Sequence, residues 1–131
     1  MMTARGTFDI ATEAEPPFLE RDGNKLNYNV VRKDFAGGMV GSSEARMITA
    51  FTNTQGSAGY VAIEHFSGSI DGRSGSCVFQ HSGVMAEGAA ELSVVIVPGS
   101  GTAELSGISG AMEIDNADGK HTYVLDYELG D

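Results

Sequence analysis

The sequence predicts an all-β protein, a single antiparallel barrel of about eight strands over residues 1–131, with little or no helix. Three observations support this fold class. Short runs of alternating apolar and polar residues recur at close spacing, as in half-buried strands. Three Asp-Gly dipeptides stand between or beside such runs and suit two-residue hairpin turns. Eighteen glycines without a collagen period indicate many tight turns and bends. Closure into a barrel removes the exposed sheet edges.

Taken in order, the predicted strands share apolar alternation and end at turn-forming residues: 7–12, 25–35, 43–52, 60–70, 73–84, 89–97, 111–115 and 120–129. The first run stops at Pro16 and Pro17, because proline cannot donate a ladder hydrogen bond. In the second run, Leu26, Tyr28 and Val30 share one side. The connector 104–109 is ambiguous, and a short helical turn is one alternative there.

A glycine pattern occurs twice at identical spacing. It consists of an aromatic residue, glycine, an aliphatic residue and glycine, in Phe35-x-Gly37-x-Met39-x-Gly41 and Phe66-x-Gly68-x-Ile70-x-Gly72. Glycine at these positions lets a strand coil sharply, as a barrel requires. We therefore expect two bends that are built alike, although a chance echo between similar turns is the alternative.

The central hairpin determines which side chains share a face. A turn at Asp71-Gly72 places Ile70 opposite Arg73, and counting back along both strands puts Glu64 and His81 on one face as diagonal neighbours. The same face carries Tyr60, Phe66, Cys77 and Phe79. A second Asp-Gly hairpin near the C-terminus pairs Ile114 with Tyr123 in the same way.

Glu64 and His81 are the strongest candidates for chemistry. If their face points into the barrel, burial raises the carboxyl pKa and a charged partner lowers it, which makes the pair a candidate for proton transfer. The alternative is a buried polar pair that satisfies itself and fixes strand register. Cys77 is expected to be a small buried hydrophobe. His65 lies on the opposite face from His81, so the two cannot share a metal ion, and we expect no metal and no cofactor.

The overall composition excludes several classes of function. A net charge of −10 argues against a nucleic-acid-binding surface, and no run approaches the roughly 18 apolar residues of a membrane span. One cysteine rules out an internal disulfide, and the first residues lack the apolar run of a signal peptide, so we expect a cytoplasmic protein. Apolar residues on the expected outer face predict a homo-oligomer: Val61, Ile63, Val95 and Val97.

Several sequence blocks carry a family resemblance over almost the whole chain: Thr7-Phe8-Asp9, Phe35/Gly37/Gly41, Tyr60-Val-Ala-Ile-Glu64, Gly68-Ser-Ile-Asp-Gly-Arg-Ser-Gly75, Phe79-Gln-His81-Ser-Gly83, Val97-Pro-Gly-Ser-Gly-Thr102, Leu105-Ser-Gly107 and Tyr123-Val-Leu-Asp-Tyr127. With them the chain resembles a family of small bacterial proteins classed as a domain of unknown function. The resemblance implies an allene oxide cyclase-like or lipocalin-like up-and-down barrel. The chain departs from the family near Glu13–Glu15, where a tryptophan is expected and this chain has none.

The resemblance implies no activity that transfers to particular residues. Allene oxide cyclases cyclise a fatty-acid epoxide inside their barrel, but no motif here maps their site, and fold does not imply function.

The residues favour a small-molecule-binding barrel that takes an apolar or amphipathic ligand. Glu64 and His81 are the expected polar anchors, and aromatic side chains are the expected walls: Tyr28, Tyr60, Phe66, Phe79 and Tyr123. Two alternatives remain open. One is an isomerase or cyclase in which Glu64 or His81 transfers a proton. The other is a non-catalytic oligomeric module whose barrel is filled by side chains.

Overall fold

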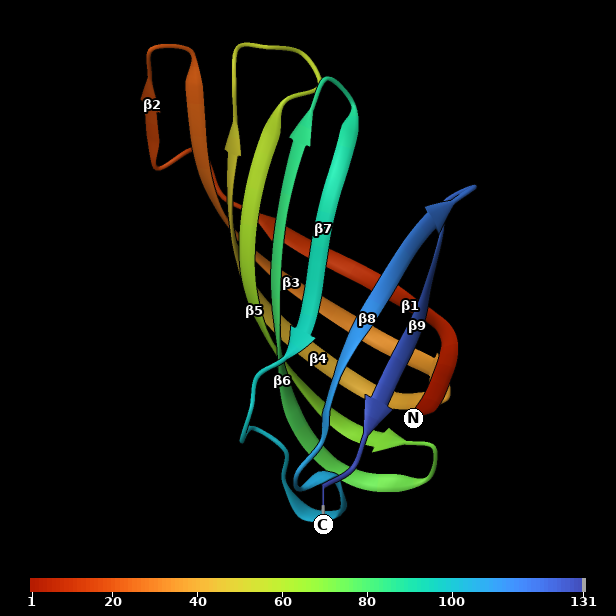
Figure 1. Cartoon of the computed structure of the whole chain (residues 1–131). Coiled ribbons are helices and arrows are strands. Elements are labelled where there is room, and N and C mark those ends of the chain that lie inside the picture. Colours follow the sequence, from red (N-terminus) through yellow and green to blue (C-terminus); the bar gives the residue numbers. More distant parts are fainter. Residues whose placement is uncertain (131) are drawn as a thin grey trace.

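The structure, a computed structural model, describes residues 1–130 and is almost entirely β (Figure 1). The strands share antiparallel pairing and are β1 (Met2–Ala14), β2 (Leu19–Arg21), β3 (Asn24–Gly37), β4 (Met39–Phe51), β5 (Ala58–Ile70), β6 (Arg73–Ala86), β7 (Ala89–Ile96), β8 (Ser109–Ala117) and β9 (Lys120–Glu128). Their hydrogen-bonded order is β1-β9-β8-β7-β6-β5-β4-β3-β2, and β1 also pairs with β3. This last pairing closes the predicted eight-stranded barrel and leaves β2 as a short addition beside β3.

The register of the central hairpin is confirmed. Glu64 lies opposite Phe79, and Ala62 lies opposite His81. The turn residues Asp71 and Gly72 have φ values of 49° and 85°, as a type I′ turn requires. The C-terminal hairpin also forms as predicted.

Two paired glycines allow the barrel to bend sharply. Gly41 of β4 lies directly opposite Gly68 of β5, and their φ values are 145° and 158°. A Cβ atom on Gly41 would lie 2.3 Å from the carbonyl oxygen of Ser67, and one on Gly68 would lie 2.1 Å from that of Val40. The backbones approach so closely that no side chain fits between them.

One end of the barrel is packed solid. The fully buried side chains there include Met39, Phe66, Ile70 and Leu105. Leu105 comes from a 3-10 helix, η1 (Ala103–Leu105). The alternative of a short helical turn in this connector is therefore the one that the structure shows. The loop before η1 is bound to β6, because the Thr102 amide donates to the Ser76 carbonyl oxygen at 2.9 Å.

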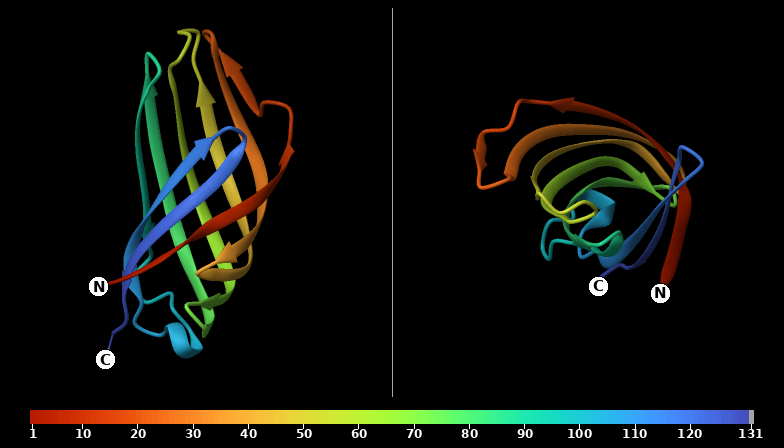
Figure 2. Two further views of the ribbon diagram at one scale, coloured as in Figure 1. Left: turned by 90° about the vertical axis from the view of Figure 1, so that its right-hand side faces the viewer. Right: turned by 90° about the horizontal axis from the view of Figure 1, so that it is seen from above.

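The other end is open. β3 to β7 extend beyond β1, β8 and β9 (Figure 2). Inward-facing Phe51, Met85 and Leu92 are 53%, 40% and 57% exposed there, because no neighbouring strand covers them.

The short strand β2 was not predicted, since its three residues show too little alternation. Among the described residues, no helix is long and apolar enough to cross a membrane.

The glycine pairing predicts a large stability difference between two positions on β5. Gly68→Ala should lower the free energy of unfolding by about 1–3 kcal/mol, because its Cβ overlaps backbone atoms that cannot move aside. Gly59→Ala is the control on the same strand, since its nearest neighbouring atom would be 3.7 Å away. It should change stability by no more than about 0.5 kcal/mol. Urea unfolding measures both, and equal losses would contradict this explanation of the bend.

Candidate functional site

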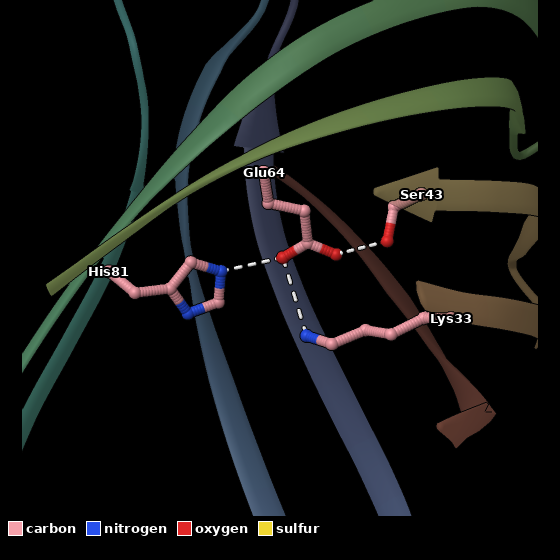
Figure 3. A network of polar contacts seen from close by, with 4 residues as sticks. All are labelled: Lys33, Ser43, Glu64 and His81. Atoms are coloured by element: carbon pink, nitrogen blue, oxygen red, sulfur yellow. Dashed lines mark hydrogen bonds and ion pairs between the residues drawn. The ribbon is translucent and has the colours of Figure 1, made fainter. Parts of the chain in front are cut away.

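The carboxylate of Glu64 is the centre of a buried polar cluster inside the barrel (Figure 3). Its Oε1 atom accepts a hydrogen bond from His81 Nε2 at 2.6 Å and contacts Lys33 Nζ at 3.3 Å. Its Oε2 atom accepts a hydrogen bond from Ser43 Oγ at 2.5 Å. All four residues are buried, with Glu64 1% exposed. The predicted contact between Glu64 and His81 is confirmed.

Four adjacent strands supply one residue each to this cluster. Lys33 of β3 lies directly opposite Ser43 of β4, and Glu64 of β5 lies opposite Ala45, two residues further along β4. Sequence reasoning missed Lys33 and Ser43. A signal for Lys33 was available, because counting back in steps of two from the core residue Phe35 gives Lys33 on the inner face.

The cluster holds Glu64 in its ionised form. Burial by itself would raise the carboxyl pKa, but the hydrogen bond with His81, the charges of Lys33 and His81 and the hydrogen bond from Ser43 together lower the pKa of Glu64 to about 2. These interactions outweigh the effect of burial on the pKa because Lys33, Ser43 and His81 all donate to the carboxylate. Lys33 also lies over the ring of Phe8, with Nζ 4.6 Å from the ring centroid.

The ionised carboxylate determines how His81 is used. A carboxylate only accepts hydrogen bonds, so the hydrogen between the two groups belongs to His81 Nε2. In the neutral ring, the lone pair is then on Nδ1. Within residues 1–130, Nδ1 has no hydrogen-bond partner. It is also not completely buried by the surrounding protein atoms. Figure 3 shows this second ring nitrogen directed away from Glu64.

A cavity of about 200 Å³ adjoins the cluster on the side of the open end. Its lining is mostly apolar and consists of Phe8, Ile10, Thr12, Val31, Lys33, Ala45, Met47, Tyr60, Ala62, Glu64, His81, Ile114 and His121. The cluster of Lys33, Glu64 and His81 is therefore the polar floor of a hydrophobic hollow.

The predicted aromatic walls occupy different places. Tyr60 borders the cavity and is half-buried. Phe66 and Phe79 lie in the packed core, 0% and 1% exposed, and do not line the cavity. Tyr28 and Lys33 are an odd number of residues apart along β3, so their side chains point to opposite faces. Tyr28 therefore lies on the outer face, where it borders a separate hollow. The expectation that Tyr28 lines the barrel cavity therefore does not agree with the register of β3.

Tyr123 and Cys77 have structural environments. The Tyr123 hydroxyl accepts a hydrogen bond from the Met39 amide at 2.7 Å and donates to the Ala36 carbonyl oxygen at 2.8 Å, which ties β9 to the bend between β3 and β4. Burial and the charge of Glu64 raise the pKa of Cys77 to about 12, so its thiol stays protonated and unreactive. His65 is exposed on the opposite face from His81, as predicted. In the part of the chain described, no three His, Cys, Asp or Glu residues form a metal-binding group.

The ion pair predicts strong coupling between two substitutions. Glu64→Gln should lower the free energy of unfolding by about 3–5 kcal/mol, because it leaves the Lys33 ammonium buried without a counter-charge. Adding Lys33→Met should recover much of that loss. A double-mutant cycle by urea unfolding measures the coupling, and losses that simply add would contradict a direct interaction.

The lowered pKa of Glu64 predicts how stability depends on pH. A carboxyl group whose folded-state pKa lies below its unfolded value stabilises the fold at pH values above the unfolded pKa, and this contribution is lost as the pH falls through the folded pKa. The stability difference between the native chain and Glu64→Gln should therefore shrink as the pH falls from 4.5 to about 2. A difference independent of pH over that range would contradict the assignment.

Comparison with known proteins places the chain in a family. The family described as "Protein of unknown function (DUF3224)" matches residues 4–127. One similar protein of known structure is a DUF3224 protein of unknown function from Shewanella oneidensis MR-1, whose sequence is 36% identical to this chain. It superimposes with a TM-score of 0.96, over 100% of this chain and 98% of that one. No curated protein matches the chain. The chain belongs to the DUF3224 family.

Proposed function

We propose that the protein binds a small, uncharged organic molecule in the cavity beside Glu64 and His81. The observation that carries the proposal is the polar floor, in which Lys33 is paired with Glu64, of a mostly apolar hollow. Ligand sites in proteins commonly combine a hydrophobic lining with a few converging polar groups. Here Nδ1 of His81 is the acceptor for a ligand, and the Lys33 ammonium is a donor.

The balance of charge favours an uncharged ligand. The positive charge of Lys33 is already neutralised by Glu64 at 3.3 Å. A charged ligand would lose its hydration in the cavity and would find no unpaired counter-charge among these two groups. A carbonyl or hydroxyl group has a smaller desolvation cost and can hydrogen-bond to Lys33 or to His81.

Three broader expectations accompany this proposal. The barrel's likeness to allene oxide cyclases is an expectation about fold alone. The cytoplasmic location is also an expectation. Homo-oligomerisation is supported by exposed apolar side chains on the outer face, where Ile48, Val61 and Ile63 are 46%, 55% and 52% exposed. A non-catalytic oligomeric module, the other alternative function named from the sequence, would depend on the same outer surface.

Filling the cavity tests the binding proposal. Ala45 is 6% exposed and lines the cavity, whereas Ala50 of the same strand faces outward. Ala45→Leu should weaken the binding of cyclohexanone, measured by NMR titration, by about tenfold or more, because the leucine occupies ligand volume. Ala50→Leu should leave the affinity unchanged. A native protein that binds neither ketones nor alcohols, and carries no ligand in native mass spectrometry, would overturn the proposal.

Proton transfer is the second candidate function, and the orientation of His81 favours it. The ionised carboxylate of Glu64 accepts the Nε2 hydrogen, so in the neutral ring Nδ1 is a base oriented by a fixed carboxylate, as in other histidine–carboxylate pairs. For a bound ketone, Nδ1 takes a proton from the carbon beside the carbonyl group. The electron pair of that C–H bond forms a carbon–carbon double bond, and the π pair of the carbonyl group moves to the oxygen, where the Lys33 ammonium stabilises the enolate. When the ketone is β,γ-unsaturated, returning the proton to the γ carbon shifts the double bond, which is an isomerase reaction.

Hydrogen–deuterium exchange tests this step without knowledge of the natural substrate. In D₂O the protein should accelerate exchange at the carbon beside the carbonyl of cyclohexanone, followed by NMR. His81→Phe should reduce the rate by about 10²–10⁴-fold, the usual contribution of a general base. Ser82→Phe, on the outer face of the same strand, is the control. Exchange at equal rates with both variants would eliminate the role of His81.

A further inference from the structure

We infer that the ligand of this cavity is an elongated, uncharged amphiphile whose apolar body lies in an open seam between β7 and β8. This inference rests on the proposed function, because it places the polar head of the ligand beside Lys33 and His81. It adds a second subsite, a direction of entry and a ligand shape.

The seam exists because β7 and β8 are joined at only one position. Val95 and Ala111 form the single residue pair between them, whereas β8 and β9 share nine. Beyond that pair the two strands diverge toward the open end (Figures 1 and 2). The hollow between them measures about 560 Å³, and its lining includes Tyr60, Leu92, Val94, Met112 and Ile114.

The sizes of the two hollows indicate that they act together. The cavity beside Glu64 measures about 200 Å³, which is below the roughly 300–1,000 Å³ of common small-molecule sites. The seam hollow alone falls within that range. Tyr60 and Ile114 line both hollows, so the hollows adjoin each other. A ligand that fills the cavity therefore has room to continue into the seam.

Tyr60 stands where the two hollows meet. Its ring lies over Gly83 of the neighbouring strand, and a Cβ atom on Gly83 would be 2.3 Å from Tyr60 Cε1 and 2.7 Å from Leu92 Cδ2. Gly83 therefore makes room for both side chains on the inner face. Within the described residues, no protein group makes a hydrogen bond with the Tyr60 hydroxyl. Burial raises the pKa of Tyr60. A ligand passing between the hollows contacts this ring.

The charges around the seam exclude an anionic tail or head. Glu113 and Asp115 of β8 are exposed at its border, and the chain as a whole carries a net charge of −10. Carboxylates at the border repel an anion approaching through the seam. The inner part of the seam is apolar, which suits an alkyl or isoprenoid-like body.

A series of methyl ketones with five, seven and nine carbons tests the seam. Affinity, measured by NMR titration, should rise about fourfold for each added methylene group that enters the apolar seam. The nine-carbon carboxylate should bind at least about tenfold more weakly than the ketone of equal length, because it is charged. Affinity that does not change with chain length, or a preference for the carboxylate, would overturn the inference.

Two matched substitutions locate the tail. Leu92 is 57% exposed and faces the seam, so Leu92→Asp should be tolerated and should remove the gain in affinity of the longer ketones. Ser93→Asp adds the same charge on the opposite face and should preserve that gain. Equal effects of both variants on the nine-carbon ketone would contradict the seam site. Failure of even the five-carbon ketone to bind would instead contradict the proposed function.

Discussion

The buried carboxylate of Glu64 constrains the structure more than any other single group. An ionised carboxylate inside a barrel is stable only when its neighbours donate hydrogen bonds and balance its charge. Here three strands supply those neighbours, with Lys33 from β3, Ser43 from β4 and His81 from β6. Because a slip of one residue would turn each of these side chains outward, the cluster specifies the register of four adjacent strands.

The barrel combines a rigid end with an open end. The pair of Gly41 and Gly68, together with η1, allows tight packing at one end, and this packed core adjoins the polar cluster. At the other end the strands extend past their partners and β7 separates from β8. Function in such a protein belongs at the boundary between the two, where side chains are held in place but a hollow remains. Glu64 and His81 lie at that boundary.

Much of this arrangement follows from local sequence. The Asp-Gly turns define the hairpin registers, so the contact between Glu64 and His81 could be predicted. Lys33 was missed because lysine is rarely buried, and because Leu26, Tyr28 and Val30 suggested the wrong inner face for β3. That face is decided by Phe35 and the core beyond it. The seam between β7 and β8 depends on strands joined by a long connector, for which no turn motif defines a register.

The central claim is that an ionised Glu64 accepts the Nε2 hydrogen of His81 and leaves Nδ1 as the acceptor of the neutral ring. The most direct measurement is a long-range ¹H–¹⁵N NMR spectrum of the His81 ring, recorded where the ring is neutral. The account predicts a protonated Nε2 and an unprotonated Nδ1. It also predicts that adding a hydroxyl-bearing ligand shifts the Nδ1 resonance and leaves the Nε2 resonance nearly unchanged. A neutral ring with its proton on Nδ1 would contradict the account.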